Sequence, residues 1–486
     1  MRVRRYLEWA VYGMGGAYGA LFLFSASLRL IYPYEVEWNE GAILDHAIRV
    51  LHGQSIYTAP SLDFSAFVYT PLYYVVTAAL MKIGAIGLWA GRLVSIISTL
   101  CTAWFAGKIV RRETASALLA FSAGMLYLAF YQTTGFFYDI VRMDALAILF
   151  AILSLYAALY LRRGYVTAAI FIALAYYTKQ QMIFIWPGIT VLLFLRQKKD
   201  ALIFAVLSIA LLLITFVSLN GITHGWFQRY TMTIPSLKAA SEFSWITALE
   251  FFPKIVIGSL GLFTFIIVVA FFTIKRVSFD RIFFALCICY VLAISSGAIS
   301  LGNPGGYSNV IMPCAAMTAI VFPIALHRIF EKISVTTSLS LVLLFLGFLS
   351  LWYDPLSQKM LFASQRQKHA GDEFIAKLRS MSGDVWIPYH GYISSLAGKP
   401  THVHFMAMND ALYLGDTTAR RYRHEIDSSL AAHRFAAIIL DEDSVFHWDS
   451  IPHYTRSEAI FVTPNVFLSR IGSAPTRPQF IYRPIP

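Results

Sequence analysis

The chain has 486 residues, of which 58% are hydrophobic and only 14% are charged, and apolar runs of about 20 residues recur along it. This composition excludes an ordinary water-soluble fold and predicts a polytopic helical membrane protein. The net charge of +12 does not indicate nucleic-acid binding, because membrane proteins collect Lys and Arg in their cytoplasmic loops.

The first apolar run, residues 7–31, follows a basic N-terminus and is too long for the apolar core of a cleaved signal peptide. It is predicted to be an uncleaved first span with its N-terminus in the cytoplasm. Basic clusters also punctuate the later runs, and the positive-inside rule places all of them in the cytoplasm. The clusters are Arg2/Arg4/Arg5, Lys108/Arg111/Arg112, Arg162/Arg163, Arg196/Lys198/Lys199, Lys275/Arg276 and Arg328/Lys332.

An even number of spans must join each basic cluster to the next, and this constraint predicts about eleven transmembrane helices. The short run 71–84 begins at Pro71 and is predicted to lie along the interface, inside a long outer loop of residues 32–87. Residues 220–254 are predicted to form another outer loop. The predicted spans are 7–31, 88–108, 113–131, 143–161, 165–178, 181–195, 201–219, 255–273, 282–300, 311–326 and 336–352.

From Asp354 the apolar density falls, and residues 354–486 are predicted to form a small extracytoplasmic α/β domain after a membrane domain of residues 1–353. The segments DVWIPYHGY and FAAIILDED are predicted strands that end at polar turns, and GDEFIAKLRSM is a predicted helix. The predicted fold class is therefore an all-α polytopic membrane domain, with interfacial helices in its first outer loop, followed by a small C-terminal α/β domain.

Neither the cysteines nor the histidines have the spacing of a metal site. His224, His402 and His404 lie in no metal-binding motif on a recognisable helix and are expected to be surface or core residues. The cysteines all fall within apolar runs, where packing roles are expected and disulfides are not. They are Cys101, Cys287, Cys289 and Cys314.

Four carboxylates crowd into the stretch YEVEWNEGAILDH, just after the first span. If residues 38–50 are helical, Glu37 and Glu40 lie near one face, where two carboxylates can divide base and orienting or metal-binding roles. The alternative is a solvated acidic loop in which Asn39 caps the helix. Spacing alone leaves both open. The four carboxylates are Glu35, Glu37, Glu40 and Asp45.

Ionisable residues also mark the outer ends of later spans. Arg142 and Asp144 stand at the head of the fourth predicted span, where charge is costly unless it is paired or functional. They fit a structural ion pair, or an arginine that reaches lipid phosphate. Lys179, at the tip of the hairpin formed by the fifth and sixth spans, fits an interfacial anchor or a cation for an anionic headgroup. Asp139 is expected to be solvated in its outer loop.

Four segments, by their order and sidedness, resemble the type C (GT-C) membrane glycosyltransferases, in particular the branch of protein O-mannosyltransferases and aminoarabinose transferases. The resemblance covers most of the membrane region and implies a multi-pass protein of the bacterial inner membrane. Its carriers are EWNEGAILDHAIRVLHGQSIY after the first span, YTPLYYVVTAAL beside the membrane, FYDIVRMDALAILF entering the fourth span and LAYYTKQQMIF at the outer hairpin.

In that family an acidic residue just after the first helix serves the acceptor, and the sugar arrives on a polyprenyl-phosphate carrier. The family's Asp-Glu pair is Asn39-Glu40 here, so the resemblance implies Glu40 as first choice for the catalytic carboxylate and Glu37 as second. Asp144 matches the acidic position of the second outer loop. A divalent metal is compatible with such carboxylates, although no metal ligands are predicted.

The implied reaction moves a sugar from a polyprenyl-phosphate donor to a hydroxyl of a glycan, lipid or protein acceptor, with inversion at the anomeric carbon. Arg142 and Lys179 would bind the donor phosphate and stabilise it as it departs. The alternatives are a ligase or polymerase of lipid-linked glycans, which uses a large basic outer loop, a transporter, and a non-catalytic scaffold. Charges gathered at the outer membrane edge, away from the midplane, disfavour the transporter.

Overall fold

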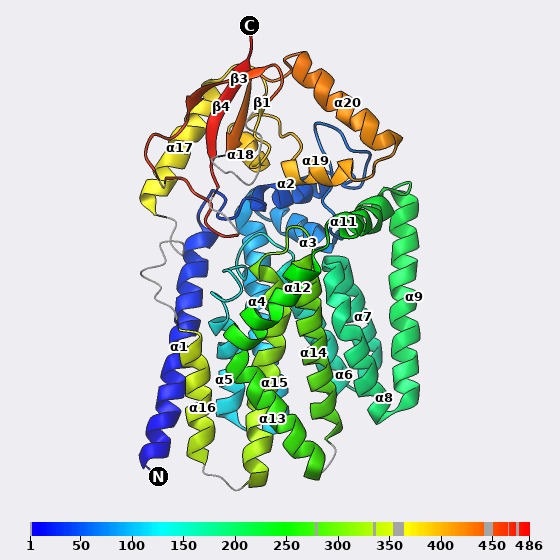
Figure 1. The fold of residues 1–486 in the computed structure, drawn as a ribbon, viewed down its shortest axis with the longest axis vertical. Helices are drawn as coiled ribbons and strands as arrows, with labels where there is room; N and C mark the ends of the chain where they lie inside the picture. Colours follow the sequence, from blue (N-terminus) through cyan, green and yellow to red (C-terminus); the bar gives the residue numbers. More distant parts are fainter. Residues whose placement is uncertain are drawn as a thin grey trace.

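The computed structural model describes residues 2–277, 280–333, 337–352, 364–441, 451–464, 466–472 and 476–486. Figure 1 shows a long bundle of helices with the N-terminus at one end and a small sheet with further helices at the other. We call the end of the bundle that carries strands β1–β4 the sheet end, and the end that carries the N-terminus the opposite end.

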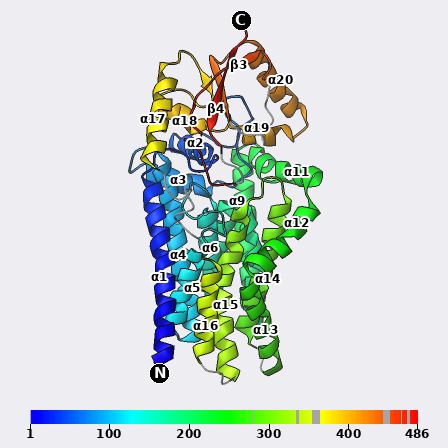
Figure 2. The same ribbon diagram turned by 60° about the vertical axis from the view of Figure 1, so that its left-hand side comes forward.

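The bundle consists of apolar helices that run roughly along its long axis in both views (Figures 1 and 2). Its centre is a single apolar cluster, to which α15 contributes many fully buried side chains, among them Ile320, Phe322 and Leu326. The bundle helices are α1 (Arg2–Leu30), α4 (Leu88–Thr114), α5 (Ala117–Ala129), α6 (Asp144–Tyr160), α7 (Gly164–Thr178), η1 (Gln180–Ile185) with α8 (Trp186–Arg196), α9 (Lys198–Ile222), α13 (Gly261–Val277), α14 (Arg281–Gly302), η4 (Ser308–Ile311) with α15 (Met312–Ile333), and α16 (Thr337–Ser350).

Within the described ranges, five helices are long and apolar enough to cross a membrane, and a bent pair of helices makes up to six. The pair breaks by 88° between residues 245–259 and 261–273. Shorter apolar helices, such as α5, α6 and α16, pack beside these spans. The chain is therefore a multi-pass membrane protein. The total of eleven spans stays a prediction, because length and composition do not show whether the shorter helices cross the membrane.

Two short helices from the first predicted outer loop lie between the bundle and the sheet: α2 (Glu40–Leu51) and α3 (Leu72–Met81) (Figure 1). The ten residues of α3 span about 15 Å, half of the ~30 Å hydrocarbon core of a bilayer. One apolar cluster joins both helices to the sheet domain, with Ile43, Tyr73 and Met408 among its buried members.

The sheet end carries a small α/β unit with strand order β1-β2-β4-β3. Strands β1 and β2 pair in parallel, with Val385 opposite Ala437, and the other two pairs are antiparallel. The predicted helix at 371–381 is confirmed by α17, and the two predicted strands by β1 and β2. The predicted domain boundary at Asp354 lies outside the described residues. The unit contains α17 (Gln365–Ser380), β1 (Val385–Trp386), α18 (Gly391–Leu396), α19 (Phe405–Leu412), α20 (Thr417–Ala431), β2 (Ala437–Asp441), β3 (Tyr454–Ala459) and β4 (Pro478–Pro484).

The predicted outer connection over residues 220–254 lies at the sheet end, and most of it is helical, which the sequence did not indicate. The helices of this segment lie across the sheet end of the bundle and contain many polar residues. Hydropathy alone does not detect such helices, because they contain no long apolar run. The last of these helices continues through η3 into the 88° break before α13, so the predicted span 255–273 is bent at its start. The helices are α10 (Trp226–Gln228), η2 (Arg229–Thr233), α11 (Ile234–Glu242), α12 (Trp245–Phe251) and η3 (Phe252–Ser259).

Candidate active site

The carboxylates after α1 are buried, so the alternative of a solvated acidic loop is excluded. Glu37 and Glu40 have no exposed surface, and Glu35 is 7% exposed. Asn39 precedes α2, but its side chain makes no capping hydrogen bond. Because α2 begins at Glu40 and leaves Glu37 in the preceding turn, the two carboxylates do not share a helix face and instead contact two different arginines.

Glu40 is held by Arg92 of α4. Its Oε1 accepts hydrogen bonds from Arg92 Nε (2.9 Å) and Val141 N (2.9 Å), and its Oε2 from Arg92 Nη2 (2.7 Å) and Val36 N (2.8 Å). Burial opposes ionisation, but the guanidinium and these donors outweigh it and lower the pKa of Glu40. Each oxygen of Glu40 accepts two hydrogen bonds, so this carboxylate holds the surrounding segments together.

Arg92 uses all five of its N–H donors. Besides Glu40 it donates to the carbonyl oxygens of Arg29 and Tyr32, each at 2.6 Å, and of Tyr34 at 2.7 Å. The Arg92–Glu40 pair thus ties the C-terminal end of α1 to the start of α2, with no exposure of either side chain. Sequence reasoning missed Arg92; the available signal was a lone arginine near the start of an apolar run.

A second buried ion pair lies beside the first. Arg29 Nη1 is 2.9 Å from Asp139 Oδ1, which also accepts a hydrogen bond from the Tyr131 hydroxyl at 2.7 Å. The expectation that Asp139 is solvated is wrong, because the segment 132–142 between the predicted spans packs inside the protein, where Arg29 compensates the charge.

Glu37 has a looser environment than Glu40. Its oxygens accept hydrogen bonds from Asn39 N (3.2 Å) and Asn39 Nδ2 (3.3 Å), and Arg142 Nη1 lies 3.6 Å from its Oε2. Burial raises the pKa of Glu37 to about 7, although Arg142 acts in the opposite direction. A carboxyl with this pKa gains and loses a proton near neutral pH, which is what a general base requires.

The backbone around Glu37 is paired with the C-terminal unit. Glu37 forms a parallel bridge with Ile471, and the carbonyl oxygen of Val36 accepts hydrogen bonds at 3.0 Å from the amides of Arg470 and Ile471. The position of Glu37 therefore depends on residues close to the end of the chain.

Arg142 connects Glu37 to a second carboxylate, Asp144, at the start of α6. Arg142 Nε lies 4.0 Å from Asp144 Oδ2, while Asp144 Oδ1 accepts from Lys179 Nζ (2.5 Å) and Asn309 Nδ2 (3.0 Å). Two nitrogens of Arg142, Nε and Nη1, and Asp144 Oδ2 are buried without a hydrogen-bond partner among the described residues. Such groups mark a place where a polar ligand can bind.

Arg142 and Lys179 line one cavity of about 350 Å³ at the sheet end of the bundle. Its walls come from segments far apart in sequence: Val68 and Tyr69, the start of η1, the helices of residues 226–242, and the turn 300–310. A third cation, Lys238 of α11, also lines it and pairs with Asp410 of α19 at 2.6 Å. The cavity thus carries three cationic side chains.

The sequence predicted that Arg142 and Lys179 reach the same outer face. In the structure both residues line the same cavity. The sequence did not predict that Lys238, Asn309 and Gln180 reach the same cavity, although Gln180 directly follows Lys179. Gln180 Nε2 donates to the carbonyl oxygen of Val68 at 2.8 Å and so fixes the wall opposite η1.

A separate buried cluster joins the first loop to the sheet domain. His390 Nδ1 hydrogen-bonds to Glu35 Oε2, and His390 Nε2 lies 2.9 Å from Asp441 Oδ2. Although burial disfavours the charged ring, Asp441 and Glu35 raise the pKa of His390 to about 10. The imidazolium therefore bridges two carboxylates at this interface.

The three histidines that the sequence analysis considered are surface or core residues. His224 is exposed, His402 is buried with Nδ1 3.0 Å from Asp63 Oδ1, and His404 is buried. Among the residues that the structure describes, no three His, Cys, Asp or Glu side chains are grouped as metal ligands. The four cysteines are free thiols, three of them buried.

Comparison with solved structures identifies the fold. The chain is similar to ArnT from Cupriavidus metallidurans bound to undecaprenyl phosphate, with 12% identity over 97% of this chain and 98% of that one, and a TM-score of 0.63. It is also similar to the Archaeoglobus fulgidus oligosaccharyltransferase tethered with an acceptor peptide containing the NVT sequon, with 12% identity over 87% of this chain and 69% of that one, and a TM-score of 0.54. No protein-family description and no curated protein matches the sequence.

A third similar structure is that of archaeal oligosaccharyltransferase AglB from Archaeoglobus fulgidus in complex with an inhibitory peptide and a dolichol-phosphate, with 12% identity over 87% of this chain and 69% of that one, and a TM-score of 0.50. The resemblance to GT-C membrane glycosyltransferases is thereby confirmed at the level of the fold. Because identity is low, roles for individual residues rest on the geometry of this chain.

Proposed function

We propose that this chain is an integral membrane glycosyltransferase that moves a sugar from a polyprenyl-phosphate donor to an acceptor hydroxyl. The observation that carries the proposal is the cavity with three cations, in which Nε and Nη1 of Arg142 are buried and make no hydrogen bond to a described residue, the facing carboxylate oxygens lying 4.0 and 3.6 Å away. A phosphate monoester or diester supplies the oxygen acceptors that these nitrogens lack. The fold shared with proteins whose structures contain undecaprenyl phosphate and dolichol-phosphate supports the same ligand class.

In the proposed reaction the acceptor oxygen attacks the anomeric carbon and forms a new C–O bond. The bond between that carbon and the phosphate oxygen breaks, its electron pair stays on the phosphate, and the configuration inverts. Arg142 and Lys179 stabilise the charge on the departing phosphate, and Asp144 holds Lys179 in place. Glu37 takes the proton of the acceptor hydroxyl, because its pKa of about 7 suits a base at neutral pH.

The role of Glu40 in this proposal is positional. Its oxygens are fully occupied by Arg92 and two backbone amides, which leaves no lone pair directed at a substrate. Glu37 therefore replaces Glu40 as the first choice for the catalytic carboxylate.

We place the sheet end of the bundle outside the cytoplasm of a bacterial inner membrane, with residues 354–486 as an extracytoplasmic domain and the N-terminus in the cytoplasm. The basic clusters support this orientation, since the start of α1 and the junction of α8 and α9, which both carry such clusters, lie towards the opposite end of the bundle (Figure 1). A cysteine placed at Ser428 should react with a membrane-impermeant maleimide in intact spheroplasts. Labelling only after lysis would reverse the orientation.

The function is tested with the purified protein and a labelled polyprenyl-phosphate sugar. Release of free polyprenyl phosphate that depends on a hydroxyl acceptor, and that is lost in Arg142→Gln, supports the proposal. A ligase of lipid-linked oligosaccharides is the second candidate, because Lys238 of the segment 226–242 lines the cavity as in a loop-based donor site. A donor with several sugars that reacts while the monosaccharide donor does not would select the ligase.

A further inference from the structure

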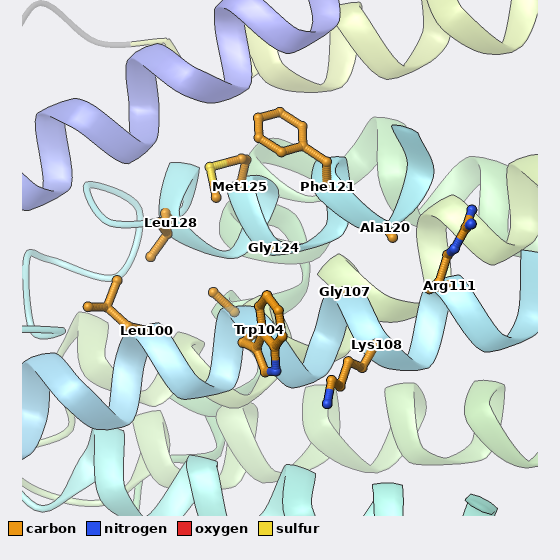
Figure 3. A pocket seen from close by; sticks show the side chains of 11 residues that line it. Leu100, Trp104, Gly107, Lys108, Arg111, Ala120, Phe121, Gly124, Met125 and Leu128 are labelled. Carbon is orange, nitrogen blue, oxygen red and sulfur yellow. The ribbon is translucent and has the colours of Figure 1, made fainter. Parts of the chain in front are cut away.

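A second cavity, of about 460 Å³, lies between α4 and α5 on the bundle side, towards the end opposite the sheet (Figure 3). Small residues bring the two helices together there. A Cβ on Gly107 would lie 2.8 Å from the carbonyl oxygen of Ala120, and one on Gly124 would lie 3.0 Å from that of Ala103. The missing side chains leave a groove with apolar walls: Leu100, Trp104, Phe121, Met125 and Leu128.

Two cations stand at one end of this groove. Figure 3 shows Lys108 and Arg111 following Gly107 along α4, with the Lys108 ammonium pointing away from α5 and the Arg111 guanidinium pointing towards it, while Leu100 and Leu128 lie towards the other end. Neither cation forms an ion pair with a described residue, and the groove has no acidic lining residue. The nearby Glu113 is taken by Arg328 at 3.3 Å and by the Tyr160 hydroxyl at 2.7 Å. Arg111 Nη1 donates a hydrogen bond to the carbonyl oxygen of Ala115, but no described carboxylate pairs with either cation, so the positive charge at this end has no countercharge among the described residues.

The length of the groove matches one leaflet of a bilayer. Leu100 and Arg111 are both on α4, and eleven steps of 1.5 Å along a helix give roughly 16 Å, about half of a ~30 Å hydrocarbon core. Trp104 is 64% exposed, and Lys108 Nζ lies 5.3 Å from the centre of its ring. An exposed tryptophan beside a lysine is typical of the membrane–water interface.

We propose that this groove is a binding site for a phospholipid with an anionic headgroup, taken from the leaflet at the end opposite the sheet. One acyl chain lies along the groove between α4 and α5, and the anionic headgroup lies at the end of the groove that Lys108 and Arg111 line. The groove opens at the opposite end of the bundle from the cavity of Arg142 and Lys179, so its occupant is distinct from the sugar donor. The site is independent of the proposed transfer reaction.

Native mass spectrometry of the full chain in detergent tests the site. The protein is offered phosphatidylglycerol and phosphatidylcholine with identical acyl chains, and the retained lipid is compared. The wild type should prefer phosphatidylglycerol, and Lys108→Gln/Arg111→Gln should lower that preference roughly tenfold or more, since each basic side chain contributes severalfold. Lys198→Gln/Lys199→Gln removes two exposed cations of α9 outside the groove and should leave the preference unchanged.

A third variant separates groove binding from surface charge. Leu100→Trp fills the apolar end of the groove without changing charge and should reduce retention of both lipids, with the melting temperature as the check on folding. An equal loss of preference in the Lys108/Arg111 and Lys198/Lys199 variants would show unspecific attraction and overturn the proposal. Unchanged lipid retention in a folded Leu100→Trp protein would overturn it as well.

Discussion

The exchange of Glu37 for Gln separates the two buried carboxylates that follow the first span. If Glu37 is the base, the variant should lose about 10²- to 10⁴-fold in turnover, the usual contribution of general-base catalysis. Donor binding should stay nearly unchanged, because Arg142 and Lys179 remain in the cavity. The assay is the release of polyprenyl phosphate from a labelled donor at saturating acceptor, with donor affinity measured separately.

Glu40→Gln is the matched control, and its effect should fall on stability. The change removes a charge from a fully buried pair with Arg92, and breaking such a pair costs about 3–5 kcal/mol. The amide nitrogen of Gln would also face a donor, since both carboxylate oxygens of Glu40 accept from N–H groups. We expect a lower melting temperature and a turnover, per folded molecule, within about tenfold of the wild type.

The pH dependence gives an independent readout for Glu37. Its pKa is raised to about 7 in the folded protein from an ordinary value of 4.5, so the folded state holds the proton more tightly than the unfolded state. The contribution of Glu37 to the free energy of unfolding is therefore complete below pH 4.5 and is lost as the pH rises through about 7. Glu37→Gln should remove this loss. The stability of the variant relative to the wild type should therefore be higher at pH 8 than at pH 5.

Activity should rise with pH through about 7 in the wild type, because the base acts when it is deprotonated, and this limb should vanish from the residual activity of the variant. The opposite pattern would refute the assignment: a folded Glu40→Gln protein without turnover beside a Glu37→Gln protein with nearly full turnover. The catalytic carboxylate would then be the one bound by Arg92.

Further expectations concern the cavity and the buried ion pairs. Arg142→Gln and Lys179→Gln should each weaken donor affinity roughly tenfold or more, measured by competition with unlabelled polyprenyl phosphate. Wild-type donor affinity in both variants would show that the two residues are structural only. Arg92→Met should lower the stability by about 3–5 kcal/mol in thermal melts, and combination with Glu40→Gln should recover part of it; an additive loss would contradict their coupling. Because His390 has its pKa raised to about 10 from 6.5, its contribution to stability is full below pH 6.5 and lost towards pH 10, so His390→Gln should destabilise the protein more at pH 6 than at pH 10.

The sequence was sufficient for the local elements. Apolar runs of helix length predict the bundle, and the alternation of cationic ends predicts that Arg142 and Lys179 reach one face. Both residues do line the same cavity. These inferences succeed because they depend on hydrophobicity and sidedness, which are local properties of a membrane chain.

The roles of the individual carboxylates depend on partners that are distant in the chain, and spacing does not reveal these. Glu40 pairs with Arg92 of α4, and Asp139 pairs with Arg29 of α1, and both pairs are buried. The sequence instead indicates Glu40 as the first choice for the base and Asp139 as a solvated acid. Lys238 lies in a segment that hydropathy predicts as a loop, since its helices lie across the bundle end and have no membrane-spanning apolar run.

The pairing of Glu37 with Ile471 has a consequence for the biogenesis of the protein. The two residues are 434 positions apart (471 − 37), so the turn that carries the proposed base receives this support only after more than 400 further residues have been synthesised. Insertion of the helices into the membrane requires no such wait. A chain that stops short of Ile471 would therefore lack the backbone pairing that supports the turn of Glu37.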